Sequence, residues 1–386
     1  MILRDNYLRK IRSALERSPV AAILGPRQSG KTTLARIIAD EQSASYLDME
    51  NPEDLARLSS PMLFLKSLSG LVVIDEIQRK PELFEILRVL ADDPSFRARF
   101  LVLGSASPRL IKSASESLAG RIAFVDLFGF DLSEVGATEY RKLWLRGGFP
   151  LAFLATEDTK SFQWRNDFIR TFLERDVPQL GITIPAETLR RFWTMVSHYH
   201  GQVWNAAEFA RSLGTAETTA RRYLDILSGA YLVRQLPSWF ENLRKRQVKS
   251  PKIYVRDSGV LHALLGIRDE HDLAGHPKIG ASWEGFAVEQ ILSLRDTRDA
   301  YFWATHTGAE LDLMILSGIR RIGFEIKYSD APSTTKSMHI ALKDLKLDRL
   351  YVLHPGQHTY PMDEKITALS ILDLQRYTSD PNWQTA

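Results

Sequence analysis

A glycine-rich loop near the amino terminus carries residue types that bind phosphate. Its sequence, Gly25-Pro26-Arg27-Gln28-Ser29-Gly30-Lys31-Thr32, fits the P-loop pattern Gly-x-x-x-x-Gly-Lys-Thr. The glycines allow a tight turn that points backbone N–H groups at phosphate oxygens. Lys31 would reach the β- and γ-phosphates, and the Thr32 hydroxyl would bind Mg²⁺. The predicted ATP contacts are Gly25, Pro26, Arg27, Gln28, Ser29, Gly30, Lys31, Thr32 and Thr33.

Two adjacent acids follow an apolar run, Leu71 to Ile74, that is typical of a buried strand. Asp75 would hold the Mg²⁺ that accompanies ATP, and Glu76 would act as general base on the attacking water. Without a nucleotide nearby, the same pair would be solvated acids at a strand end. The P-loop upstream favours hydrolysis.

Ser105 and Arg121 are two further candidates for the same reaction. Ser105 follows the apolar run Phe100 to Gly104 and would orient the water between the γ-phosphate and Glu76. Arg121 lies in Leu118-Ala119-Gly120-Arg121 and would act as an arginine finger on a neighbouring subunit. The alternatives are a simple turn serine and an intramolecular salt bridge.

Four charged residues near the carboxyl terminus form a second candidate site. Asp312 lies on a predicted strand, and Glu325 and Lys327 share one face of a strand predicted over 322–328. Glu284 lies on the apolar stripe of a predicted helix, where a carboxylate requires a partner. In a nuclease the carboxylates would bind Mg²⁺ and Lys327 would position the nucleophile or stabilise charge. The alternative is a salt-bridged set without catalysis.

The order of elements places these candidates in different domains. Short apolar strands alternate with helices up to about residue 130, which predicts an α/β fold with a parallel sheet flanked by helices. Helices follow, and a helix from Asn205 to Leu213, a turn at Gly214 and a helix over 216–227 fit a winged helix-turn-helix. A separate α/β domain follows.

The segment from Arg221 to Arg256 has nine basic residues and two acids, which is a candidate polyanion surface. The alternatives are a solvated face and a winged helix that is structural or contacts protein. The predicted DNA contacts, mostly to phosphate, are Thr218, Arg221, Arg222, Arg244, Lys245, Arg246 and Lys249.

Composition limits the remaining classes. The 386 residues include no cysteine, which excludes disulfides and thiolate metal sites. The amino terminus has no signal-peptide pattern and no apolar run is long enough to span a membrane. We therefore expect a cytoplasmic protein. The net charge of +3 says little about partners.

Several of these motifs together resemble a large family of prokaryotic AAA+ ATPases with a carboxyl-terminal domain of unknown function. The motifs are Gly-Pro-Arg-Gln-x-Gly-Lys-Thr-Thr-Leu, Val-Ile-Asp-Glu-Ile-Gln, Gly-Ser-Ala-Ser, Leu-Ala-Gly-Arg, Gly-Gly-Phe-Pro, Arg-Arg-Tyr-Leu, Lys-Ser-Pro-Lys-Ile-Tyr and Gly-Ala-Glu-Leu-Asp. The set Glu284, Asp312, Glu325 and Lys327 resembles the PD-(D/E)xK nucleases, including archaeal Holliday-junction resolvases.

The resemblance implies four parts. They are an AAA+ core (1–135), a helical lid (136–185), a winged helix-turn-helix (186–258) and a restriction-endonuclease-like α/β domain (259–386). It also implies a homo-oligomer, such as a hexamer.

The sequence supports more than one function. We expect Mg²⁺-dependent ATP hydrolysis coupled to binding or remodelling of duplex or branched DNA, such as Holliday junctions in branch migration or repair. The first alternative is a nucleotide-controlled signalling or defence switch with a nuclease-like effector domain, active or inactive. The second is a binding module with slow ATP turnover.

Overall fold

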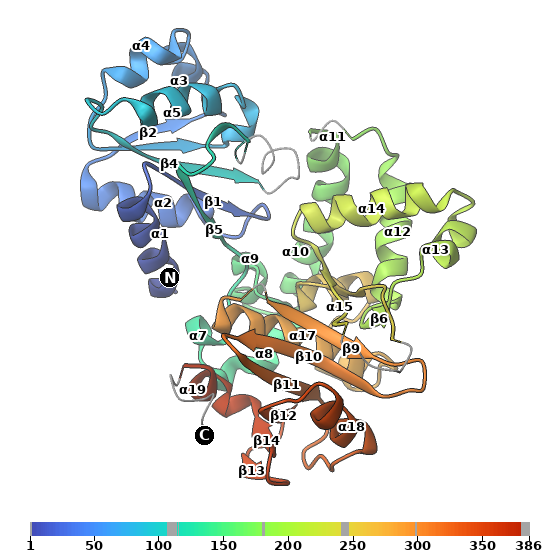
Figure 1. Ribbon diagram of the computed structural model, residues 1–386. Helices are drawn as coiled ribbons and strands as arrows, with labels where there is room; N and C mark the ends of the chain where they lie inside the picture. Colours follow the sequence, from blue (N-terminus) through green and yellow to red (C-terminus); the bar gives the residue numbers. More distant parts are fainter. Residues whose placement is uncertain are drawn as a thin grey trace. The chain divides into compact units, whose positions relative to one another are not determined.

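The chain forms two compact units in the computed structural model (Figure 1). The first comprises Met1–Gly129 with Gly229–Tyr231, and the second Phe130–Ser228 with Leu232–Ala386. The structure describes residues 2–105, 114, 116–179, 182–240, 247–297 and 299–379. In these ranges no helix has both the length and the apolar character needed to cross a membrane.

The first unit is built on a five-stranded sheet in which every neighbouring pair is parallel. The strand order is β2-β3-β4-β1-β5. The strands are β1 (Val20–Gly25), β2 (Ser45–Asp48), β3 (Leu71–Asp75), β4 (Arg99–Ser105) and β5 (Ile122–Asp126). The predicted parallel sheet is therefore confirmed, and β5 is a strand that the sequence pattern did not reveal.

Helices cover both faces of this sheet (Figure 1). They are α1 (Asp5–Arg17), α2 (Lys31–Gln42), α3 (Pro52–Arg57), α4 (Pro61–Lys66) and α5 (Leu83–Asp92). Ala21 and Ile23 of β1 pack in one apolar cluster with α1 and α2, whereas Val20, Ala22 and Leu24 pack in another with α4 and α5. Because both faces are covered, polar chemistry is confined to the strand ends.

The second unit begins with a run of helices. They are α7 (Leu132–Val135), α8 (Tyr140–Arg146), α9 (Pro150–Phe153), α10 (Asp158–Thr171), α11 (Val177–Gln179) and α12 (Ala186–His198), with a π-helical turn at Phe172–Asp176. Arg165 of α10 is fully buried and donates to the carbonyls of Ser161, Leu145 and Gly259. These bonds link α10 to the ends of its neighbours.

A helix-turn-helix and a small sheet follow. Helix α13 (Ala206–Leu213) is capped by the Asn205 side chain and ends at the left-handed Gly214, as predicted, and α14 covers Glu217–Gly229. The three-stranded sheet has the order β6-β8-β7, with β6 (Gln202–Val203), β7 (Val233–Leu236) and β8 (Lys252–Val255). The helix-turn-helix elements are thus present, while their assignment to a winged helix stays a prediction.

The last part of the second unit contains a six-stranded mixed sheet in the order β13-β14-β12-β11-β10-β9. Its strands are β9 (Ala300–Ala304), β10 (Glu310–Ser317), β11 (Arg320–Ile326), β12 (Arg349–His354), β13 (Tyr360–Pro361) and β14 (Ile366–Ser370). The accompanying helices are α15 (Ser258–Leu265), α16 (Glu270–Ala274), α17 (Ile279–Arg295), α18 (Lys336–Asp344) and α19 (Leu374–Ser379).

The carboxyl-terminal part has the predicted mixture of helices and strands, but β13 and β14 were not predicted, and β11 begins at Arg320, two residues before the predicted start. The strand predicted over 322–328 stops at Ile326, because Lys327 and Tyr328 lie beyond the last residues paired with β12. The predicted α/β character of this part is confirmed. Its restriction-endonuclease-like fold and the boundaries at 135, 185 and 258 stay predictions.

Candidate nucleotide site and acidic centre

The predicted nucleotide residues meet at one edge of the first sheet. Strand β4 lies between β1 and β3, and Ser105 is in direct register with Gly25 on β1. On the other side of β4, Ile74 is in register with Val102, so Asp75 follows at the same edge. The sheet order therefore brings together the end of β1, which leads into the P-loop, Ser105 and the acid pair.

The P-loop has the backbone geometry of a phosphate cradle. Gln28 and Gly30 have left-handed φ values of 62° and 95°, and the loop leads directly into the amino terminus of α2. A Cβ at Gly25 would lie 2.0 Å from the carbonyl oxygen of Leu127, so this position excludes any side chain. The Lys31 ammonium donates to the carbonyls of Gly25 and Pro26, at 3.0 and 2.7 Å.

A buried arginine ties the loop to the rest of its unit. The Arg4 guanidinium donates to the carbonyls of Ser29, Phe128 and Gly129, each at 2.9 Å. It connects the start of α1, the P-loop and the segment after β5. Nothing in the spacing of the amino-terminal residues marked Arg4 as different from the other basic residues of α1.

The residues predicted to hold Mg²⁺ are in contact. The Thr32 hydroxyl donates to Asp75 Oδ2 at 2.9 Å, and Tyr46 on β2 donates to the same oxygen at 2.7 Å. Asp75 is 4% exposed, and its Oδ1 accepts from the backbone N–H of Glu76. A hydroxyl and a carboxylate oxygen are the hard ligands that Mg²⁺ requires, so these residues fit the ion.

Glu76 is held in a strained and partly buried position. Its φ of 52° is left-handed, which is uncommon for a side chain larger than glycine and is often found at functional sites. Gln78 donates a hydrogen bond to its Oε2. Burial raises the pKa of Glu76 above the ordinary value, against the opposing effect of Lys31 and Arg27. A raised pKa makes this carboxylate a better proton acceptor.

Ser105 has a free hydrogen-bonding capacity at the centre of this edge. Its Oγ is buried and has no hydrogen-bond partner within the described part of the chain. A buried unsatisfied hydroxyl is costly and calls for a missing partner. The position, between the P-loop and the acid pair, fits the predicted contact with a water or a phosphate oxygen.

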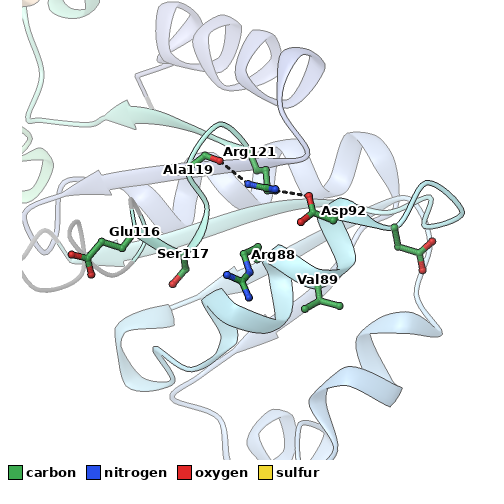
Figure 2. Close-up of a pocket in the computed structure, with 8 residues that line it drawn as sticks. Arg88, Val89, Asp92, Glu116, Ser117, Ala119 and Arg121 are labelled. Carbon is green, nitrogen blue, oxygen red and sulfur yellow. Dashed lines mark hydrogen bonds and ion pairs between the residues drawn. The ribbon is translucent and has the colours of Figure 1, made fainter.

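Arg121 lies at the opposite edge of the sheet. Its carbonyl accepts from the N–H of Val20, where β1 begins, so the length of β1 separates it from the P-loop, roughly 16 Å at 3.3 Å per residue. Its side chain donates to Asp92 and to the carbonyl of Ala119 (Figure 2). These residues, with Arg88 and Glu116, line a pocket of about 440 Å³.

Three of the carboxyl-terminal candidates, Glu284, Asp312 and Glu325, lie close to Glu310, and these four carboxylates are called the acidic centre. Lys252, which the sequence analysis did not include, lies among them. Its ammonium is 3.1 Å from Glu284 Oε1 and 3.3 Å from Asp312 Oδ1, and it also pairs with Glu310. The prediction that Glu284 requires a partner is confirmed, and β8 of the other sheet supplies it.

The remaining members of the predicted set lie on β11 or directly after it. Lys327 donates to Glu325 Oε1 at 2.7 Å, and Asp312 Oδ2 accepts from the N–H of Ile326 at 2.9 Å. Burial, followed by the negative charge of Asp312, raises the pKa of both Glu284 and Glu325 to about 7. No group of three or more histidines and acids within the described ranges is arranged to hold a metal.

Four of the seven predicted DNA contacts belong to the described part of the second unit. Thr218, Arg221 and Arg222 are exposed on α14, and Arg221 pairs with Glu217 at 3.8 Å. Lys249 is exposed near the start of β8. Arg244, Lys245 and Arg246 lie outside the described residues.

The backbone on either side of these three residues pairs with β9. Trp239 N–H donates to the carbonyl of Phe302 and Val248 N–H to that of Ala304, at 2.6 and 3.0 Å. The side chain of Gln247 accepts a hydrogen bond from the indole of Trp303. Trp239 and Val248 are therefore both bound to β9, the edge strand of the six-stranded sheet.

Comparison with known families agrees with the nucleotide site. Residues 17–136 match a family described as an AAA domain, so this chain contains an AAA-type P-loop ATPase domain, a class that binds nucleotides. Residues 137–271 and 279–374 match two domains of unknown function, DUF8612 and DUF4143.

Two relatives match over nearly the whole chain. They are the uncharacterized proteins Rv2008c of Mycobacterium tuberculosis and Mb2031c of Mycobacterium bovis, each 52% identical over 369 residues, which cover 96% of this chain and 84% of each relative. This chain belongs to the same protein family.

The solved structures that match include two distant ones. The Walker-type ATPase PabY2304 of Pyrococcus abyssi is 16% identical, with a TM-score of 0.45, over 69% of this chain and 96% of its own. The Thermotoga maritima RuvB Holliday junction branch migration motor is 20% identical, with a TM-score of 0.30, over 61% and 90%. These scores are too low to carry an inference about function.

The contact between Tyr46 and Asp75 predicts a role in Mg²⁺ binding. Tyr46→Phe should weaken the Mg²⁺ affinity of the nucleotide complex about tenfold, because outer hydrogen bonds orient ligand carboxylates. A fluorescent ATP analogue titrated with Mg²⁺ measures the effect, and nucleotide affinity without Mg²⁺ should be unchanged. Tyr231→Phe is the matched control, since Tyr231 donates to Asp126 in the same unit. Equal effects in the two variants would argue against this role.

Proposed function

We propose that the first unit hydrolyses Mg²⁺-ATP, with Glu76 as general base. The observation that carries the proposal is the 2.9 Å hydrogen bond between Thr32 and Asp75, directly beside Glu76. In P-loop enzymes these positions hold the metal and activate the water. The bound Mg²⁺ would neutralise charge on the β- and γ-phosphates.

The chain's own groups have separate tasks in this proposal. Lys31 exchanges the two carbonyls that it now contacts for the β- and γ-phosphate oxygens. Gln78 orients the carboxylate of Glu76, and Ser105 uses its unsatisfied hydroxyl on the water or the γ-phosphate. Each task requires only a local side-chain rearrangement at one edge of the sheet.

Glu76→Gln should lower kcat for ATP hydrolysis by about 10²- to 10³-fold and leave nucleotide binding intact. The base acts only when ionised, so activity of the wild type should fall as pH decreases through its pKa. Burial raises this pKa, so the fall should occur at higher pH than for an exposed glutamate. A phosphate-release assay across pH measures both effects. If the residual activity of Glu76→Gln falls at low pH in the same way as that of the wild type, the fall is caused by a group other than Glu76.

We propose further that Arg121 acts on the nucleotide of a neighbouring copy in a homo-oligomer. The support is its location, because it lies at the edge of the sheet opposite its own P-loop. It would have to leave Asp92, and the pocket shared with Arg88 and Glu116 offers space for a partner surface (Figure 2). Residues of this kind stabilise charge on the transferred phosphoryl group.

Arg121→Ala should lower kcat by about 10³-fold if this arginine is a finger in trans. Asp92→Ala breaks the same ion pair but keeps the guanidinium, so it should retain activity. Mixing Arg121→Ala with Glu76→Gln should restore activity at about one site in four of randomly mixed assemblies. If Arg121→Ala and Asp92→Ala lose ATPase activity equally, and mixing restores none, the role of Arg121 is purely structural.

We also propose that ATP turnover is coupled to duplex or branched DNA through α14. The support is the exposed set Thr218, Arg221 and Arg222, on the second helix of the helix-turn-helix, with Lys249 exposed as well. These side chains suit phosphate contacts, which make binding strongly dependent on salt. A signalling switch would instead hold nucleotide tightly and turn it over slowly, without stimulation by DNA.

Arg222→Ala should weaken binding to four-way and linear DNA and reduce the salt slope by about one. Arg190→Ala, an exposed arginine on α12, is the matched control for charge and should leave the slope unchanged. Fluorescence anisotropy at several salt concentrations gives the slope, and ATPase rates with each DNA report coupling. The DNA proposal fails if both variants bind as the wild type does and DNA leaves the ATPase rate unaltered.

A further inference from the structure

A lysine ammonium occupies the acidic centre of the second unit. Lys252 is 3% exposed, although its side chain carries a full charge. Its Nζ lies 3.1 Å from Glu284 Oε1 and 3.3 Å from Asp312 Oδ1, and it forms a third ion pair with Glu310. Three carboxylates from α17 and β10 thus surround one cation that comes from β8.

Lys252 finds an opposite charge in three directions. Its ammonium donates hydrogen bonds to Glu284 and Asp312 and forms an ion pair with Glu310. Tyr254, two residues along the same face of β8, donates its hydroxyl to Glu284 Oε1 at 2.6 Å. Lys252 and Tyr254 of β8 therefore both donate to Glu284, which lies on the apolar face of α17.

We propose that Lys252 is the built-in cation of the acidic centre, that it excludes divalent metal, and that the centre joins β8 to α17 and β10 instead of catalysing metal-dependent cleavage. A divalent ion bound between Glu284 and Asp312 would need the oxygens that Lys252 now contacts. It would also lie within a few ångströms of a buried ammonium, where like charges repel strongly. The two cations compete for one position.

The charges around the site fit this arrangement. Burial lowers the pKa of Lys252, but Tyr254, Glu284, Asp312 and Glu310 together outweigh it, so the pKa lies well above the ordinary value and the side chain stays charged. Glu325 Oε2 is buried and has no hydrogen-bond partner within the described residues. Once the ammonium is removed, Glu284, Glu310 and Asp312 lose the cation that they share, and the cluster should attract a metal ion.

Lys252→Met keeps the volume of the side chain and removes its charge. We expect this variant to bind Tb³⁺ at least tenfold more tightly than the wild type, measured by luminescence excited through Tyr254, whose hydroxyl contacts Glu284. Mn²⁺ should displace the Tb³⁺ and should raise the Tm of the variant but not of the wild type. The titrations use the 386-residue chain without nucleotide.

Two further variants show where the metal binds. Adding Glu284→Gln to Lys252→Met should abolish the gained luminescence. Arg256→Met is the matched control, because Arg256 and Arg234 neutralise the single buried carboxylate of Glu289. It uncovers part of a buried acid without creating a cluster, so it should gain no Tb³⁺ binding. A gain in Arg256→Met equal to that in Lys252→Met would overturn the proposal.

The wild type alone keeps the proposal falsifiable if Lys252→Met does not fold. Tb³⁺ luminescence of the wild type that is lost in Glu284→Gln would contradict exclusion of metal. Mg²⁺- or Mn²⁺-dependent cleavage of linear or four-way DNA by the wild type, abolished by Asp312→Asn, would contradict it as well. The proposal is supported if the wild type shows neither Tb³⁺ luminescence nor metal-dependent cleavage. Where Lys252→Met folds, the comparison uses the Tb³⁺ concentrations at which that variant binds.

Discussion

The strand order of the first sheet is the constraint on which the nucleotide site depends. Both faces of this sheet are covered by helices, so polar side chains gain access to a ligand only at the strand ends. Because β4 lies between β1 and β3, Ser105 at the end of β4 lies between the strand that leads into the P-loop and the strand that carries Asp75. A different order of the same strands would separate these groups and leave the buried Asp75 without Thr32.

The second unit depends on charges that are neutralised inside it. Burying a charged group is costly unless hydrogen bonds and opposite charges compensate it. Glu289 is compensated by two arginines and Lys252 by three carboxylates, while Nε and Nη1 of Arg165 donate to three backbone carbonyls. Such clusters contribute little net stability, but breaking one leaves an uncompensated charge. They therefore favour one arrangement of helices and strands over alternatives.

The sequence revealed the features that are local along the chain. The P-loop, the acid pair after an apolar strand and the cap at Asn205 all depend on neighbouring residues, and each lies where the spacing predicted it. Strand β5 was missed because it is short and alternates between buried and half-buried residues. Tyr46 and Arg4 were missed because they act through residues 29 and 25 positions away. No local pattern encodes such contacts.

The acidic centre shows both the reach and the limit of the same reasoning. The pattern of one helix is enough to conclude that a carboxylate on its apolar face requires a partner. Glu284 has such partners in Lys252 and Tyr254. The identity of the partner could not be derived, because Lys252 belongs to another sheet and lies 32 residues away. Backbone hydrogen bonds from Trp239 and Val248 to β9, together with the ion pairs of Lys252, hold β8 beside the six-stranded sheet.

Contacts between distant residues also change the interpretation of the basic segment from Arg221 to Arg256. Its charge count treats nine basic residues as equivalent. Arg234 and Arg256, however, pair with Glu289, and Lys252 pairs with three carboxylates of the acidic centre. These three are internal counter-ions and contribute nothing to a surface that binds phosphate. Among the described residues, Arg221, Arg222 and Lys249 are exposed. A charge excess counted along a sequence therefore overstates the surface charge wherever some of the basic side chains pair with buried acids. Lys252 of β8 is such a residue, because it pairs with Glu284 and Asp312.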